Sequence, residues 1–492
     1  MFTDRPAATV TGRPRRRWRV WLLLVGVPVA LLVLAVGVWF IRVNGRLQAA
    51  IAEADRLDPR WRLEDIEADR FTPPPGQNAA DKIVAVRRLT PAKWWDPTKA
   101  QLFDDLLPER RLNDQQIAAL RELLEPVGPA LAEARSLIDT PRGRHFLTYA
   151  PIWLETRQPA GDNRDVAALL RYDIFDKAQA GDADGAARSC HAAFHAGCSI
   201  GDEPFALSQV VRVAVQAIAV NLLERTLAQG EPSEAVLAAL QSRLEDEEPA
   251  PLLLYAMRGD RAGIFRVFDN LRNGSVSVTD MLGPLDTLSF ENLRCRNPAS
   301  VICAQTWCLR SATAAVEIAK LPPEQWAVPF AEQGNASEEQ FRTGQLGRLH
   351  ALAGLLITRG QAEIFQRNHA LLRCAIVAVA AERYRRAKGH WPATPDELVK
   401  AGLLKAVPGD PFAAGQPVKF VRLGDGLVVY SVGQDGTDDG GKLDKDPKKP
   451  GTDYGVRLWD VTARRQPPLP PKPADTDESI AKPQAAAAGG PP

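Results

Sequence analysis

Four side chains that commonly bind metal ions cluster near the middle of the chain. They are Cys190, His191, His195 and Cys198. On a helix, His191, His195 and Cys198 occupy positions i, i+4 and i+7, which lie on one face. Imidazole nitrogen and thiolate sulfur are both zinc ligands. The spacing therefore permits a zinc site or an enzyme that uses this face. A core helix with small buried thiols and surface histidines gives the same pattern.

Acid–base chemistry has one further candidate, the pair Asp202 and Glu203 before Pro204. Two adjacent carboxylates suit general acid–base catalysis. Acidic residues also favour the start of a helix, where the dipole is positive. The chain has no G-x-S-x-G, Walker A, H-E-x-x-H or G-x-G-x-x-G motif in a suitable context. We therefore predict a protein that is not an enzyme.

The C-terminal part of the chain has the clearest local patterns. Thr394 is expected to cap a helix, and Glu397 completes a capping box with it. Residues 418–423 and 427–432 flank a Gly-Asp-Gly turn, which predicts a β-hairpin. Residues 456–459 predict a third strand. These elements would form a small α+β module behind a long helix.

Taken together, the motifs of this module resemble the globular domain of the major pseudopilins of type II secretion. The segment reads A-E-R-Y-R-x-x-x-G-x-W-P-x-T-x-x-E-L, then V-P-x-D-P-F, Y-S-V-G-x-D-G and a downstream G-T-D. The N-terminus lacks the pseudopilin leader, so the resemblance implies a shared fold and not a pilus subunit. The layout of the whole chain also resembles large membrane proteins of planctomycete-type bacteria. The matching residues are Tyr384, Gly389, Pro392, Leu398, Pro408, Asp410, Pro411, Tyr430, Ser431, Gly433, Asp435, Gly436 and Asp453.

The resemblance to pseudopilins implies a calcium site in the acidic glycine loop after the hairpin. Calcium takes six to eight oxygen ligands from carboxylates and carbonyls, and glycines permit the tight winding that such a loop needs. A plain acidic turn has the same composition. The expected calcium ligands are Asp435, Asp438, Asp439, Asp453 and Ser431.

An uncharged apolar run of 22 residues, 20–41, predicts a transmembrane helix. The basic residues before it outnumber those that follow it closely, namely Arg42 and Arg46. This excess places the N-terminus in the cytoplasm and the body outside it, on a bacterial inner membrane. A cleaved signal peptide is the alternative reading. The preceding basic residues are Arg13, Arg15, Arg16, Arg17 and Arg19.

Alanine- and leucine-rich segments with helical periodicity fill the region between the anchor and the module. The predicted fold is therefore mainly α: a transmembrane helix, an α-helical array and a small α+β module with a β-hairpin. We expect a basic N-terminus (1–19), the anchor (20–41), a stalk and linker (42–112), a helical body (113–344), the long helix with its module (345–465) and a disordered tail (466–492).

A net charge of +1 gives no basic field for nucleic acid. The predicted partners are the lipid bilayer and envelope or secretion proteins. The predicted function is a membrane-anchored, extracytoplasmic scaffold or interaction protein that is associated with secretion. The alternative is a metal-binding protein or enzyme that uses the Cys190/His191/His195/Cys198 face.

Overall fold

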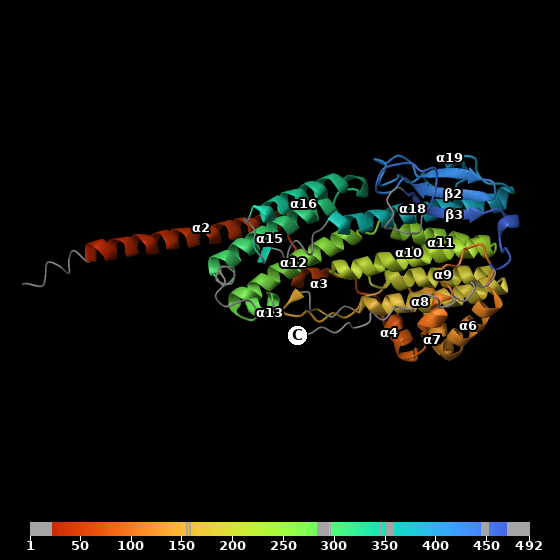
Figure 1. The fold of residues 1–492 in the computed structure, drawn as a ribbon, viewed down its shortest axis with the longest axis horizontal. Coiled ribbons are helices and arrows are strands. Elements are labelled where there is room, and N and C mark those ends of the chain that lie inside the picture. Colours follow the sequence, from red (N-terminus) through yellow and green to blue (C-terminus); the bar gives the residue numbers. More distant parts are fainter. Residues whose placement is uncertain are drawn as a thin grey trace, which may run out of the picture.

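The computed structural model describes residues 22–153, 156, 159–282, 295, 297–343, 347, 349–350, 359–443 and 452–469. The chain is mainly helical, with one small antiparallel sheet near the C-terminus, as predicted. Long helices lie side by side in an elongated body, and a single helix projects from one end (Figure 1). The arginine cluster at 13–19 and the start of the apolar run lie outside the described residues.

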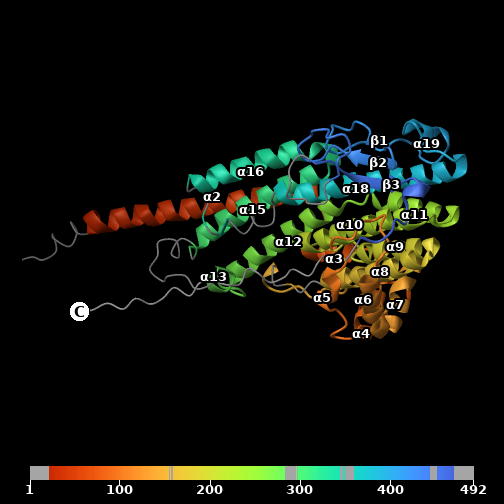
Figure 2. The ribbon, with the colours of Figure 1, turned by 45° about the vertical axis from the view of Figure 1, so that its right-hand side comes forward.

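Helix α2 (Val27–Leu57), preceded by the π-helical turn Leu22–Gly26, has the length and composition of a membrane anchor or a signal sequence. Its first part is exposed and apolar, whereas Val43, Leu47, Ala50 and Ala54 form a buried stripe at helical spacing. This stripe packs against α15 (Pro298–Ala319), which runs beside α2 in both views (Figures 1 and 2). The residues that follow the apolar run thus continue the helix to Leu57 and pack along the body.

The body is built from helices that run along one another in layers (Figure 1). Helices α8, α9 and α10 make the most extensive mutual contacts, and α4, α6 and α7 lie against α8 and α9 on the outer side. Helix α12 pairs with α15 at the end near α2. The bounds are α3 Leu63–Asp69, α4 Ala79–Leu89, α5 Pro97–Gln101, α6 Asp114–Leu124, α7 Gly128–Arg135, α8 Ala160–Ala180, α9 Ala183–Cys198, α10 Ala206–Gln229, α11 Glu234–Glu247, α12 Leu252–Asn273, α13 Val278–Leu282 and α16 Ala327–Arg342.

The C-terminal part consists of α18 (Arg359–Lys388), α19 (Asp396–Lys400) and three strands. Strands β1 (Lys419–Leu423), β2 (Gly426–Ser431) and β3 (Tyr454–Trp459) form an antiparallel meander in the order β1-β2-β3. The hairpin and the third strand thus follow the prediction. The sheet packs on α18, and β3 also contacts α10.

One cluster of buried apolar side chains runs through both the helical body and the C-terminal part, from Ala79 to Leu458. On α18, every residue from Cys374 to Ala381 is buried in it. The predicted boundary at 344/345 therefore does not separate two hydrophobic cores. The sheet is seated on the helical body through α18.

Local capping follows the sequence only in part. Helix α6 begins with a capping box between Asn113 and Gln116. The expected box at Thr394 is not formed: Glu397 instead accepts hydrogen bonds from the Ala393 backbone N–H and the Tyr384 hydroxyl. The tyrosine belongs to α18, so the carboxylate ties two helices together.

The predicted tail, 466–492, begins within the folded structure. The Gln466 backbone N–H donates to Glu109 O, and its carbonyl accepts from the Arg111 N–H. A short parallel bridge results between residues that lie far apart in the sequence. Residues 470–492 lie outside the described part of the chain.

Candidate functional site

The five expected calcium ligands occupy two different environments. Ser431 and Asp453 are fully buried at the ends of β2 and β3, whereas Asp435, Asp438 and Asp439 are exposed in the loop between these strands. The Ser431 hydroxyl donates to Asp410 at 2.7 Å. The strands thus position Ser431 and Asp453, whereas the loop carries the other three aspartates.

The carboxylates of this loop accept hydrogen bonds from the protein itself. Asp453 accepts from the Gly441 N–H at 2.7 Å, and burial raises its pKa. Asp438 accepts from Lys419 Nζ at 2.6 Å and from the Tyr430 hydroxyl at 3.0 Å. The lysine bond holds the pKa of Asp438 below its usual range. An ammonium group at Asp438 opposes a divalent cation there.

The geometry therefore does not fit a calcium shell in its described form. In the part of the chain that the structure describes, no three His, Cys, Asp or Glu side chains are grouped so that they could hold a metal ion. Asp435 accepts from the Thr437 N–H, as in an ordinary Asx turn. The calcium site stays a prediction that rests on the resemblance.

Asp410 is the organising residue of this region. It is fully buried and accepts from the Val432 N–H at 2.9 Å, the Phe412 N–H at 2.9 Å and the Ser431 hydroxyl. Three donors satisfy the buried carboxylate, which fixes the turn before β1 against the end of β2. The D-P-F motif was the sequence signal for this residue, although its partners were not predictable.

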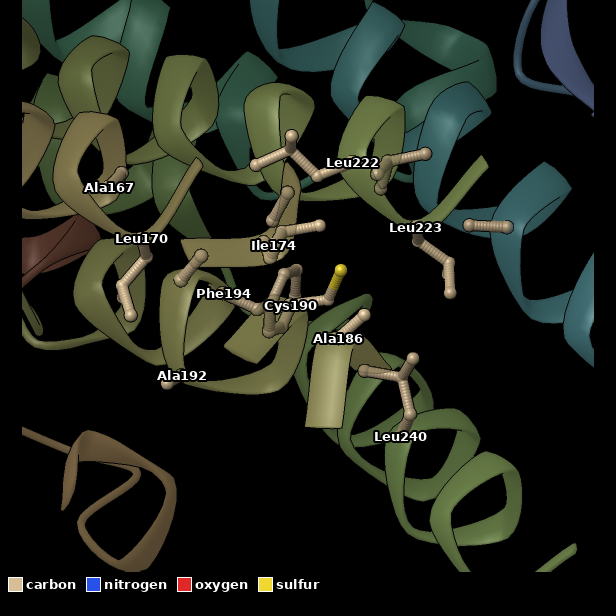
Figure 3. Packing of buried hydrophobic residues seen from close by; sticks show 14 of the residues in the cluster. Ala167, Leu170, Ile174, Ala186, Cys190, Ala192, Phe194, Leu222, Leu223 and Leu240 are labelled. Atoms are coloured by element: carbon tan, nitrogen blue, oxygen red, sulfur yellow. The ribbon is translucent and has the colours of Figure 1, made fainter. Parts of the chain in front are cut away.

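The imidazole and thiol residues lie on α9, as expected, but the helix directs them to different surroundings. Cys190 points into the apolar core among Ala186, Leu222 and Leu223 (Figure 3). Its Sγ lies 3.2 Å from Thr226 Oγ1, and burial raises the pKa of the thiol to about 12. A neutral thiol in the core is a packing group and a poor metal ligand.

The two histidines of α9 are adjacent, with ring centroids 4.5 Å apart. His195 Nδ1 lies 2.8 Å from Leu137 O, which orients the buried ring. Burial, with a smaller contribution from the nearby Arg243, lowers the pKa of His191 to about 4; burial, the neighbouring His191 and Arg243 lower the pKa of His195 to about 3. Both rings are therefore neutral at pH 7, beside a permanent positive charge.

Cys198 lies next to a buried ionic network instead of a metal-binding group. Burial raises the pKa of its thiol to about 11. Glu247 accepts from Arg212 Nε at 2.9 Å, from Gln216 Nε2 at 2.7 Å and from Arg243 Nη2 at 2.8 Å. Two arginines close to the thiol disfavour a zinc ion. The structure therefore places all four residues on one helix without assembling a metal site.

The two acidic residues, Asp202 and Glu203, lie in different surroundings. Asp202 accepts from the Phe71 N–H at 2.8 Å and from Arg70 Nε at 3.3 Å, so it joins the loop after α3 to the corner before α10. Glu203 is fully buried, and burial raises its pKa to about 7. A second buried acid, Asp260 on α12, has its pKa raised to about 7 for the same reason, and it accepts from Trp153 Nε1.

A groove with a volume of about 320 Å³ lies between α10, α18 and β3. The Arg367 guanidinium lies 4.4 Å from the centroid of the Tyr454 ring, a cation–π arrangement at the groove wall. Asn368 beside it is buried and donates to Gln216. The described lining has no Ser, Cys or His, and its titratable side chains are those of Glu224, Arg367, Asp453 and Tyr454. Asp453, which the sequence analysis singled out, is part of its lining.

Comparison with known protein families, with curated proteins and with solved structures gives no match for this chain.

Proposed function

We propose that the chain is a single-pass protein of a bacterial inner membrane and that it serves as an extracytoplasmic scaffold for other envelope proteins. The observation that carries this proposal is the division of α2. Its apolar part, which ends at Ile41, is exposed, whereas the buried stripe from Val43 onward is packed into the body. A helix of this kind connects a bilayer to a folded body without a flexible joint.

The charges at the two ends of the apolar run support the orientation. Five arginines precede the run between 13 and 19, and two, Arg42 and Arg46, follow it closely. Cytoplasmic flanks carry the basic excess. The body is therefore on the extracytoplasmic side, where its long helical flanks face other envelope proteins.

The interactions of the candidate chemical groups favour a scaffold over an enzyme. Cys190 is a core residue, Cys198 adjoins the Arg212–Glu247 network, and Asp202 joins two loops. These side chains stabilise the fold in the described structure. The pseudopilin-like module adds the proposal that the partners belong to a secretion apparatus.

Membrane topology is tested on the full chain in bacterial cells. An intact anchor keeps the N-terminal peptide in the mature protein, retains the chain in carbonate-washed membranes and exposes the body to protease in spheroplasts. A mature protein that starts beyond residue 41 would show a cleaved signal sequence and overturn the proposal. A body that is protected in spheroplasts but cleaved in lysed cells would overturn the orientation.

The metal-binding alternative is separated by metal analysis of the purified full chain. The scaffold proposal expects no stoichiometric zinc, and the same result for His191→Ala/His195→Ala as for the wild type. Zinc that is bound by the wild type and lost in the double variant would establish the alternative.

A further inference from the structure

The strongest unassigned feature is an apolar groove at the end of the body from which α2 projects. It has a volume of about 620 Å³ and lies between α2, the end of α12, α13 and the start of α15. In both views α13 and the first turns of α15 lie at this end of the body (Figures 1 and 2). Its apolar lining includes Phe40, Leu271, Val276, Val278, Val301 and Ile302.

The position of Phe40 sets the depth of this groove relative to a bilayer. Phe40 belongs to the exposed apolar part of α2, and Val43, three residues on, is already buried in the body. With a rise of 1.5 Å per residue, these positions are ~5 Å apart along the helix axis. The groove therefore lies at the level where the apolar run reaches the membrane–water interface. It is continuous with the lipid-facing surface of α2.

The polar groups near the groove match the charge of a phospholipid headgroup. Arg272 lines the groove; its guanidinium donates to Gln305 Oε1 at 3.3 Å and pairs with Asp269 at 3.6 Å, and the side chain is 38% exposed. Arg42 and Arg46 are exposed on α2 just beyond Phe40. Arginines at this level pair with lipid phosphates, while apolar walls suit an acyl chain.

We propose that this groove binds a membrane phospholipid, with one acyl chain between Phe40 and α15 and the phosphate near Arg272. The inference rests on the proposed function, because it requires α2 to be embedded in a bilayer. The groove is lined by α2 and by α12, α13 and α15 of the body. A lipid bound there would contact both the membrane helix and the body, and it would therefore fix the angle between the body and the membrane surface.

The test uses the full chain in nanodiscs of phosphatidylcholine and phosphatidylglycerol that contain a phosphatidylcholine with a diazirine on one acyl chain. After illumination, peptide mass spectrometry locates the label. We expect labelling of α2 and also of residues 271–282 and 297–302. Label on α2 with none on these two segments would overturn the lipid site and leave the proposed function intact. Absence of label from α2 would overturn both.

A matched pair of variants separates groove occupancy from general membrane contact. Thr279 is exposed and lines the groove, so Thr279→Trp blocks it. Ser275 is exposed in the same segment and does not line it, so Ser275→Trp is the control. Thr279→Trp should reduce labelling of 297–302 about tenfold, which corresponds to ~1.4 kcal/mol, without changing the label on α2. Equal labelling of 297–302 in the two variants would overturn the proposal.

Discussion

Arg464 and Glu382 form a buried bidentate ion pair across 82 residues of sequence, with N–O distances of 3.0 and 2.9 Å. The side chains are 4% and 0% exposed. The same guanidinium donates to the carbonyls of Trp459 and Gly230. One arginine after the last strand thus joins the sheet, α18 and the turn between α10 and α11.

Substitution of Glu382 should therefore destabilise the whole body. Glu382→Gln leaves the buried Arg464 cation without its anionic partner, and breaking such a pair costs about 3–5 kcal/mol. Urea unfolding of the detergent-solubilised chain, followed by tryptophan fluorescence, measures the change. Arg60→Ala is the control, because the Arg60–Asp69 pair is 55% and 46% exposed and such exposed pairs contribute little to stability. Equal losses in the two variants would contradict this account.

Gly263 on α12 is expected to be a close-packing position. A Cβ there would lie 2.0 Å from Trp153 Cδ2, and Trp153 stacks on Phe205 at 4.1 Å. Gly263→Ala should cost about 1–3 kcal/mol, because the ring must shift in a packed core. Gly334, inside α16, has open space at its Cβ position. Gly334→Ala should instead raise the free energy of unfolding by about 0.5–1 kcal/mol. Thermal unfolding of the two variants measures these changes. If both substitutions stabilise the protein, the close contact between Gly263 and Trp153 is refuted.

The raised pKa of Glu203 predicts a pH-dependent stability term. The folded protein holds this proton up to about pH 7, whereas the unfolded chain releases it near the ordinary value of 4.5. The stabilising contribution is present below pH 4.5 and is lost as pH rises through 7. Relative to the wild type, the Glu203→Gln variant should therefore be more stable at pH 8 than at pH 5. The difference in free energy of unfolding between variant and wild type should change by on the order of 3 kcal/mol between these pH values.

The free energy of unfolding of Glu203→Gln must be compared with that of the wild type at each pH, because other groups also titrate. His191 and His195 have lowered pKa values, so their stabilising contribution is lost as pH falls, in the opposite sense. Glu338→Gln, on the exposed face of α16, is the control. Unfolding midpoints at pH 5 and pH 8 decide the question. A Glu203→Gln effect that is the same at both pH values would contradict the proton assignment.

The calcium prediction has a direct test in thermal stability. Lys419 holds Asp438 and backbone N–H groups hold Asp453, so these two carboxylates of the described part of the loop have partners without a cation. We therefore expect the same melting temperature for the full chain in excess calcium and in excess EDTA. A rise in calcium that disappears in Asp453→Asn would instead establish the site that the resemblance implies.

The elements whose signals come from neighbouring residues were predictable from the sequence. Helical periodicity located α8, α9 and α10, and the Gly424–Gly426 turn located the hairpin. The apolar run of α2 was equally evident, because length and hydrophobicity are local properties. A β-turn depends on a few adjacent side chains, and so does the pairing of two short strands across it, whereas the cap expected at Thr394 was lost to a contact between Glu397 and Tyr384 of α18.

The tertiary structure alone decided how these elements share a core and which polar side chains meet. The α9 spacing put His191, His195 and Cys198 on one helix, but only packing placed Cys190 in the core and Arg243 beside the histidines. The Arg464–Glu382 pair and the groove at Phe40 likewise join segments far apart in the chain. Such contacts depend on burial and on loop closure over long separations, which leave no periodic signal in a single sequence.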